Sequence, residues 1–364
     1  MLYRKYRPQK FSEIVGQEHV VKTLQGALES GRISHAYLFT GSRGTGKTSL
    51  ARIFAKALNC NKRQETRDKN EPCNNCYSCV AATQGNLLDL IEIDAASNRG
   101  IDEIRNLKES ALVAAPGGGY KVFVIDEVHA LTKDAFNALL KIIEEPPGHV
   151  VFILATTEPH KILPTVLSRV QRFDFKRLNQ TQISEKLKMM ARKEGIKIAD
   201  EAIKTIAASA DGALRDAEVA LSKVQASTDS GQTVSADDVS EVLGLVAYKY
   251  YPEFIGYILR NDKVGAMDLI QKVYLSGVDM ENFAGKLVEY ARDVLMAKIN
   301  PVVLASVSGI NNEEAEQISS LSQNADGQRL IKIIVSLSNA RNEIRHSPVP
   351  QLPLELAVIE LTNN

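Results

Sequence analysis

The sequence predicts an α/β domain built on a doubly wound parallel sheet, followed by two helical domains. Short apolar runs alternate with helical patterns between residues 34 and 178. After about Leu178 the strand pattern disappears, and amphipathic helical patterns continue to the last residues. Strand–helix alternation is typical of a doubly wound sheet. We therefore predict an α/β domain over residues 1–178, a small helical domain over 179–242 and a larger helical domain over 243–364.

The predicted strands are, in chain order, HAYLFTG, LLDLIEID, YKVFVIDE and VVFILATTE. They are too continuously apolar for strands with one exposed face, which favours parallel strands buried on both sides. Helices are predicted between them at KTSLARIFAKALN, GIDEIRNLKESALV and KDAFNALLKIIEE, with turns at PGGG (116–119) and EPPG (145–148). Later helices include MENFAGKLVEYARDVLMAKI and QRLIKIIVSLSNARNEI, and the polar stretch STDSGQT (227–233) separates two others.

The composition excludes several classes of protein. Lys+Arg and Asp+Glu are equal at 44 each, which argues against a generic nucleic-acid coat but not against a local basic face. Trp is absent and aromatic residues are 6%, so base-stacking platforms are not expected. The chain has no apolar run of membrane-spanning length, and MLYRKYRPQK does not resemble a secretory signal. We expect a cytoplasmic protein without membrane contact, in which clustered cysteines more often bind metal than form disulfides.

The segment GSRGTGKT, from Gly41 to Thr48, matches a phosphate-binding loop between a predicted strand and a predicted helix. Its glycines let successive N–H groups face phosphate oxygens, and the following helix N-terminus favours negative charge. Lys47 is predicted to reach the β and γ phosphates, and the Thr48 hydroxyl to bind Mg²⁺. A glycine-rich turn with a chance Lys-Thr pair is the alternative. The predicted nucleotide-binding residues of this segment are Gly41, Ser42, Arg43, Gly44, Thr45, Gly46, Lys47, Thr48 and Ser49.

The strand VFVIDEVH ends on Asp126 and Glu127. Mg²⁺ needs a carboxylate and the attacking water needs a base, so Asp126 is predicted in the Mg²⁺ shell and Glu127 beside the water. The alternative is an acidic pair that caps the next helix. The order of the two segments along the chain favours the catalytic interpretation.

The chain's four cysteines, Cys60, Cys73, Cys76 and Cys79, have the spacing C-x12-C-x2-C-x2-C. Four thiolates form a closed tetrahedral set, which is typical of structural Zn²⁺. An iron–sulfur cluster, redox chemistry and a disulfide remain alternatives. We predict a zinc module over residues 60–79, inserted between the helix after the phosphate loop and the next strand.

Longer segments carry a resemblance to a known family. They are YRPQKFSEIVGQEHV, GRISHAYLFTGSRGTGKTS, LIEIDAASN, VFVIDEVHALTKDAFNALLKIIEEPP, LATTEPHKILPTVLSR and GALRDA. In these the chain resembles AAA+ ATPases, and among them the gamma/tau clamp-loader subunits of bacterial DNA polymerase III. The resemblance covers the first two predicted domains densely and the third only by length and helical pattern. It implies an AAA+ P-loop domain with a zinc module, a small helical lid domain and a C-terminal helical collar that sets the oligomer.

The resemblance also implies roles for single residues. Thr157 corresponds to a sensor of the γ-phosphate and water, Arg169 to an arginine finger acting on a neighbouring subunit's ATP, and Arg215 to a second sensor. Without the resemblance, these would be a strand-end cap, a surface ion pair and a solvated helix charge. The family usually has Ser-Arg-Cys where this chain has Ser-Arg-Val at 168–170, which keeps the arginine. The adenine pocket is implied at Arg7, Pro8 and Val15.

The predicted function is therefore an ATPase subunit of a sliding-clamp loader, with other clamp-loader subunits, the sliding clamp and primed DNA as partners. Two alternatives are a nucleotide-binding scaffold without turnover and a branch-migration motor. Intact Lys47, Thr48, Asp126 and Glu127 argue against the scaffold. The helix that begins near Arg99 and Arg105 could face DNA or carry ordinary solvated charges, and the helix with Phe136 and Leu140 is a family-based expectation for clamp contact.

Overall fold

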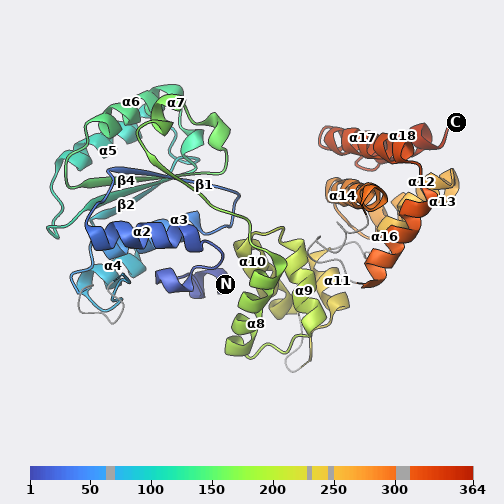
Figure 1. The fold of residues 1–364 in the computed structure, drawn as a ribbon, viewed down its shortest axis with the longest axis horizontal. Helices are drawn as coiled ribbons and strands as arrows, with labels where there is room; N and C mark the ends of the chain where they lie inside the picture. The colour runs from blue at the N-terminus through green and yellow to red at the C-terminus, as the bar shows by residue number, and fades with distance from the viewer. Residues whose placement is uncertain (63–69, 228–231, 245–249, 301–311, 364) are drawn as a thin grey trace. The chain divides into compact units, whose positions relative to one another are not determined.

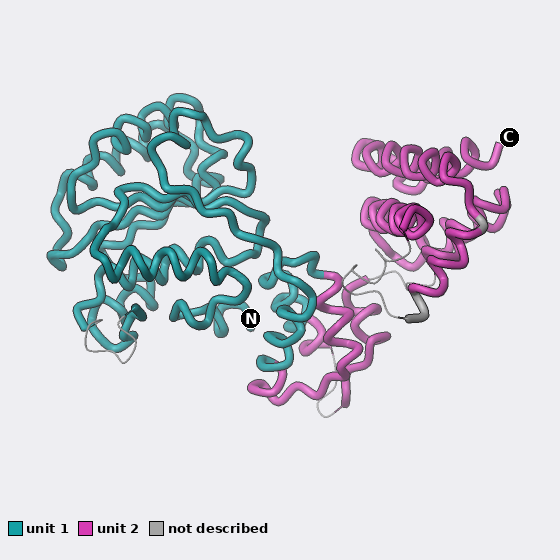
Figure 2. The backbone as a smooth tube through the Cα atoms, viewed as in Figure 1, with its two compact units in different colours: residues 1–190, 210–222 teal, residues 191–209, 223–364 magenta. Residues whose placement is uncertain are grey.

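The computed structural model describes residues 1–62, 70–227, 232–244, 250–300 and 312–363. The chain forms two compact units, residues 1–190 with 210–222 and residues 191–209 with 223–364 (Figure 2). The three domains predicted from the sequence divide the chain differently, and that division stays a prediction. Part of the predicted zinc module, residues 63–69, and most of the polar break at 227–233 lie outside the described residues.

The first unit contains a five-stranded parallel sheet in the order β2-β3-β4-β1-β5 (Figure 1). Its strands are β1 (Ala36–Thr40), β2 (Leu90–Asp94), β3 (Lys121–Asp126), β4 (Val150–Thr156) and β5 (Gln171–Asp174). Every residue of β1 and β4 is buried, which explains why these runs are continuously apolar. The predicted parallel sheet is confirmed.

The fifth strand was not predicted. In β5, only Phe173 is buried, and the flanking residues are exposed. An edge strand this short and polar lacks the continuous apolar run that identified the other strands.

Helices cover both faces of the sheet (Figure 1). On one face, α5 (Ile101–Leu112), α6 (Lys133–Glu144) and α7 (Pro164–Leu167) pack on Phe123 and Phe152. On the other, α2 (Glu18–Ser30) and α3 (Lys47–Leu58) pack on the strand residues of opposite parity, such as Tyr37 and Val124. The period of two along each strand thus divides its side chains between two cores.

Five short elements and two longer helices, α8 and α10, complete the first unit and lead into the second. They are α1 (Leu2–Lys5), η1 (Phe11–Glu13), α4 (Tyr77–Gln84), η3 (Val128–Ala130), η4 (Pro159–Lys161), α8 (Gln180–Glu194) and α10 (Leu214–Ser227). The start of α10 belongs to the first unit, which brings residues 210–222 into the same body as the phosphate loop.

The second unit is helical, as predicted. It contains α9 (Asp200–Ser209), α11 (Ala236–Leu243), α12 (Tyr250–Leu259), α13 (Lys263–Leu275), α14 (Met280–Ile299), α16 (Asn312–Asn324), α17 (Gly327–Ile344) and α18 (Leu352–Thr362). The helices from α12 onward share one core that includes Phe254, Phe283 and Leu337. α13, α14 and α17 each begin after an aspartate whose carboxylate accepts a backbone N–H of the first turn. Among the described residues, no helix has the length and apolar character needed to cross a membrane.

Candidate nucleotide site

The predicted phosphate loop lies between β1 and α3, where backbone geometry requires glycine. Gly41, Gly44 and Gly46 have φ values of 143°, 78° and 100°. A Cβ on Gly41 would lie 2.5 Å from the carbonyl oxygen of Phe175, and one on Gly44 would lie 2.9 Å from Cβ of Ala213. Positive φ and close packing therefore both exclude larger residues from the loop.

Lys47, the first residue of α3, is only 6% exposed. Its Nζ donates hydrogen bonds to the carbonyl oxygens of Gly41 at 2.7 Å and Ser42 at 2.8 Å. Burial lowers the pKa of the Lys47 ammonium, and the Glu127 and Asp126 carboxylates oppose that shift. The loop thus holds a cation inside its own curve, beside two carboxylates.

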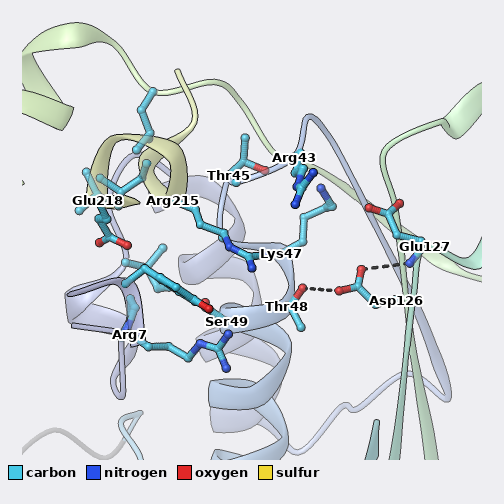
Figure 3. A pocket seen from close by; sticks show the side chains of 18 of the residues that line it. Arg7, Arg43, Thr45, Lys47, Thr48, Ser49, Asp126, Glu127, Arg215 and Glu218 are labelled. Atoms are coloured by element: carbon cyan, nitrogen blue, oxygen red, sulfur yellow. Dashed lines mark hydrogen bonds between the residues drawn. The ribbon is translucent and has the colours of Figure 1, made fainter. Parts of the chain in front are cut away.

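The Thr48 hydroxyl donates a hydrogen bond to Asp126 Oδ2 at 2.7 Å (Figure 3). The other carboxylate oxygen, Oδ1, accepts the Glu127 backbone N–H at 3.0 Å. A hydroxyl and a carboxylate from two elements therefore meet at the end of β3. Mg²⁺ prefers oxygen ligands of this kind, so these residues fit the predicted ion.

Glu127 adopts a left-handed conformation with φ 49°, which is costly for a residue other than glycine. Its Oε2 accepts hydrogen bonds from the Thr157 hydroxyl at 3.0 Å and the Thr157 backbone N–H at 3.3 Å. His129 Nδ1 lies 3.4 Å from the same oxygen. The carboxylate is thus fixed between the ends of β3 and β4.

These groups surround a cavity of about 420 Å³ in the first unit. Most of the predicted nucleotide-site residues line it: Arg7, Pro8, Val15, Arg43, Gly44, Thr45, Gly46, Lys47, Thr48, Ser49, Asp126, Glu127 and Arg215. Gly41, Ser42 and Thr157 do not line the cavity directly. The carbonyl oxygens of Gly41 and Ser42 accept hydrogen bonds from Lys47, and the Thr157 hydroxyl donates to Glu127.

Arg169 lies apart from the cavity. Its guanidinium pairs with Glu144 at 3.0 Å and donates to the Thr165 carbonyl oxygen at 2.8 Å. Within one chain it is thus an exposed ion-paired residue, and its action on a neighbouring subunit stays a prediction.

The other family-based surfaces also stay predictions. Arg105 is exposed and pairs with Asp102 at 2.9 Å, so a local carboxylate offsets its charge. Phe136 is buried in the sheet core, so only other positions of α6 could meet a partner.

Sequence reasoning missed seven residues that line the cavity: Tyr3, Ile14, Asp94, Ala96, Leu178, Leu214 and Glu218. Figure 3 shows Glu218 and Arg7 at the end of the cavity opposite Asp126 and Glu127. The Arg215 guanidinium lies 5.0 Å from the centre of the Tyr3 ring. Because Glu218 follows Arg215 by three residues on α10, the two share a helix face. That spacing could have indicated Glu218.

Glu218 should make the first unit less stable as pH rises. Burial raises the pKa of this carboxyl from 4.5 to about 7, although the charges of Lys186 and Arg7 favour ionisation. Between pH 4.5 and about 7, the folded protein therefore holds a proton on Glu218 that the unfolded chain has already lost. Stability therefore falls as pH rises from about 4.5 through about 7, by about 3 kcal/mol in total.

Urea unfolding at pH 5 and pH 8 tests this expectation. Glu218→Gln should match the unsubstituted protein at pH 5 and exceed its stability at pH 8. The control Glu109→Gln, at an exposed position of α5, should change neither value. If the unfolding free energies of Glu218→Gln and the unsubstituted protein differed equally at both pH values, the raised pKa of Glu218 would be contradicted.

The four cysteines converge as predicted and are free thiols in this structure. Their Sγ atoms all lie within 4.8 Å of one another, with Cys73 and Cys79 at 3.8 Å. A tetrahedral Zn²⁺ with Zn–S bonds of about 2.3 Å separates sulfurs by about 3.8 Å, so this cluster fits the ion. Burial opposes ionisation of Cys73, but N–H groups of Asn75 and Cys76 lower its pKa to about 7.

Glu71 connects the cysteine module to the N-terminal segment. Its carboxylate is buried and accepts the backbone N–H groups of Phe11 and Ser12, both at 2.7 Å. Lys56 and Thr83 both donate to Gln9 Oε1, at 2.8 and 3.1 Å. The module is thus attached to the segment that carries Arg7 and the other N-terminal residues of the cavity.

Two family models match separate parts of the chain. The model described as DNA polymerase III, delta subunit matches residues 16–179, and the model described as DNA polymerase III subunits gamma and tau domain III matches residues 234–364. Among solved structures, the Thermotoga maritima RuvB Holliday junction branch migration motor is 21% identical, with a TM-score of 0.49 over 70% of this chain and 79% of that chain. The Bacillus subtilis DNA clamp loader delta protein is 15% identical, with a TM-score of 0.41 over 94% of this chain and all of that chain.

Curated relatives align along almost the whole chain. DNA polymerase III subunit tau of Bacillus subtilis is 41% identical, and the match covers 99% of this chain and 62% of that protein. The chain spans about half the length of other tau subunits, such as 54% of that of Salmonella typhimurium at 36% identity. DNA polymerase III subunit gamma of Buchnera aphidicola is 33% identical, with 99% of this chain and 98% of that protein covered. The resemblance inferred from the motifs is confirmed, and the chain belongs to the gamma/tau family of DNA polymerase III subunits.

Proposed function

We propose that this chain is an ATP-hydrolysing AAA+ subunit of a DNA polymerase III clamp loader. ATP binding and hydrolysis would drive opening of the sliding clamp and its loading onto primed DNA in the cytoplasm. The observation that carries the proposal is the hydrogen-bonded series Thr48–Asp126 and Glu127–Thr157 at the mouth of the phosphate loop. A cavity that only bound nucleotide with Mg²⁺ would not need Glu127, a second carboxylate fixed next to Asp126.

In the proposed mechanism, the loop N–H groups and the α3 N-terminus bind the phosphates of ATP. Lys47 turns from the carbonyl oxygens of Gly41 and Ser42 to the β and γ phosphates. Thr48 and Asp126 would hold Mg²⁺, which neutralises charge on the phosphates when bound. Glu127, fixed by Thr157, orients and polarises the attacking water. Arg7, Pro8 and Val15 hold the base, and Arg215 approaches the phosphates from α10.

We further propose that Arg169 completes the ATP site of a neighbouring subunit. Its exposed position and its local partner Glu144 support this, because an exposed ion pair is weak and readily exchanged for a phosphate partner. The helices of residues 243–364 would assemble the chain with other clamp-loader subunits, as homo- and hetero-oligomer.

Turnover assays of the assembled complex distinguish this proposal from its alternatives. We expect an ATPase rate that rises when both primed DNA and clamp are present. A complex that binds ATP without hydrolysing it would support the scaffold instead. A rate that responds to a branched DNA junction but not to the clamp would support the motor.

We propose that Cys60, Cys73, Cys76 and Cys79 hold one structural Zn²⁺. Metal analysis of the purified chain should find one zinc per chain. Cys79→Ser should lose the ion and lower the thermal midpoint by roughly 5 °C or more, because metal-binding free energy is part of folding free energy. Ser78→Ala, at the neighbouring buried position, should keep the zinc. An iron cluster or a disulfide in the purified protein would overturn the assignment.

A further inference from the structure

A second cavity, of about 630 Å³, lies beside the nucleotide cavity in the first unit. Helices α1, α3 and α4, the N-terminal segment and the start of α10 form its walls. Its volume is within the range of roughly 300–1,000 Å³ that small-molecule sites occupy. Size alone does not identify a ligand, but the charge of the walls does.

The walls carry six cationic side chains, Arg4, Lys5, Arg7, Arg52, Lys56 and Arg215. Among the described residues that line this cavity, none is Asp or Glu. The chain as a whole has a formal net charge of zero, so the average composition of the chain does not account for this excess of cations. Like charges close together cost free energy unless an anion offsets them.

The partners of these cations are mostly neutral. Lys56 donates to Gln9 and Thr83, while the Arg4 Nε donates to the Tyr3 hydroxyl at 3.1 Å. Arg215 lies over the Tyr3 ring, as described above. These three neutral groups and the Tyr3 ring hold Lys56, Arg4 and Arg215 in place without adding a negative charge to the cavity.

Arg7 and Arg52 show the resulting excess of positive charge. Burial lowers the pKa of Arg7, and the nearby charges of Arg52 and Arg215 lower it further against the opposing effect of Glu92. Glu92 pairs with Arg52 through one guanidinium nitrogen, but Nε of Arg52 is buried without a hydrogen-bond partner. Arg52 thus keeps one donor without a partner, while Arg7 lies near the carboxyl groups of both Glu92 and Glu218.

We propose that this basic cavity binds a compact phosphate anion of the diphosphate class, at a site distinct from the phosphate loop. Guanidinium groups bind phosphate oxygens through paired hydrogen bonds, and several such groups suit more than one phosphate. A duplex backbone fits less well, because it needs an exposed stripe of charge and Lys56 is only 2% exposed. Free pyrophosphate and the diphosphate of a nucleotide share this chemistry.

The two cavities share Arg7 and Arg215 in their walls. An anion in the basic cavity therefore acts on cations that also face the nucleotide. By linkage, any effect of this anion on ATP affinity must equal the effect of ATP on affinity for the anion. The second site is thus placed to adjust the first.

Calorimetric titration of the full chain with inorganic pyrophosphate tests the proposal. Lys47→Ala removes the phosphate-loop cation, and this variant should still bind one pyrophosphate. Adding Arg4→Gln, Lys5→Gln and Arg52→Gln should weaken that binding about tenfold or more. The matched control adds Lys22→Gln, Lys108→Gln and Lys133→Gln to Lys47→Ala, removing three exposed charges elsewhere, and should bind as Lys47→Ala does.

Loss of all pyrophosphate binding in Lys47→Ala would overturn the second site. Equal weakening in the control would assign the binding to general charge, which also overturns it. If the cavity substitutions weakened binding of a short DNA duplex but left pyrophosphate binding unchanged, the cavity would be a DNA contact instead. Repeating the titration with ADP in place of pyrophosphate distinguishes the two sources: binding of both indicates a nucleotide diphosphate, and binding of pyrophosphate alone indicates the free anion.

Discussion

Replacing Lys47 by alanine is expected to reduce ATP affinity at least about a hundredfold and to remove turnover. The ammonium is buried inside the loop and bonded to the Gly41 and Ser42 carbonyl oxygens, which fixes it at the centre of the predicted phosphate site. A charge-assisted hydrogen bond to phosphate contributes about 1.5–3 kcal/mol, and Lys47 is predicted to reach two phosphates. Titration with a fluorescent ATP analogue measures the affinity directly.

The control for this substitution is Lys108→Ala, an exposed lysine on α5 that should bind ATP normally. Circular dichroism and a thermal scan should show that Lys47→Ala remains folded. If folded Lys47→Ala bound ATP with unchanged affinity, the phosphate-loop assignment would be wrong.

Arg169→Ala is expected to leave ATP binding by the isolated chain unchanged and to reduce DNA-stimulated turnover of the assembled complex by about 10³-fold. The Arg169 guanidinium pairs with Glu144 and does not line the cavity of its own chain. Its removal therefore leaves that cavity unchanged. An arginine finger provided by a neighbouring subunit contributes 10³ to 10⁵ in rate in comparable enzymes. Steady-state ATP hydrolysis with primed DNA and clamp measures the effect.

Two matched variants separate the finger from general surface charge. Glu144→Ala breaks the local ion pair but keeps the arginine, so turnover should persist. Arg172→Ala removes a nearby exposed cation that pairs with Asp174, and it should also be active. Normal turnover in Arg169→Ala would refute the finger assignment.

The parts of the site that the residue pattern alone predicted lie in short local motifs. A strand, a glycine loop and a helix start give Lys47 and Thr48 a fixed local geometry, and Asp126 follows from a buried strand that ends in carboxylates. Parallel strands then bring Asp126 and Thr157 to one edge of the sheet, because their carboxyl ends coincide. Lys47, Thr48 and Asp126 follow from local pattern, whereas Thr157 was indicated only by the family resemblance.

The residues that were missed depend on packing between distant segments. Leu178, Leu214 and Glu218 reach the cavity only because the start of α10 packs in the same unit as the phosphate loop. Periodicity defines a helix face but not the surface that the face meets. Phe136 illustrates the same limit, since it belongs to the buried side of α6, while clamp contact by that helix stays a prediction.

The two hydrogen bonds that Glu71 accepts connect the cysteine cluster to the proposed nucleotide site. They fix the backbone at Phe11 and Ser12, between Arg7 and Val15 of the nucleotide cavity, and Glu71 stands two residues before Cys73. In the proposed zinc-bound ATPase, metal loss or thiol oxidation at the cysteines would release the support of the segment that carries Arg7 and Val15. Under these two proposals, zinc supply and redox state would be linked to nucleotide affinity, and bound nucleotide would in turn retain the metal.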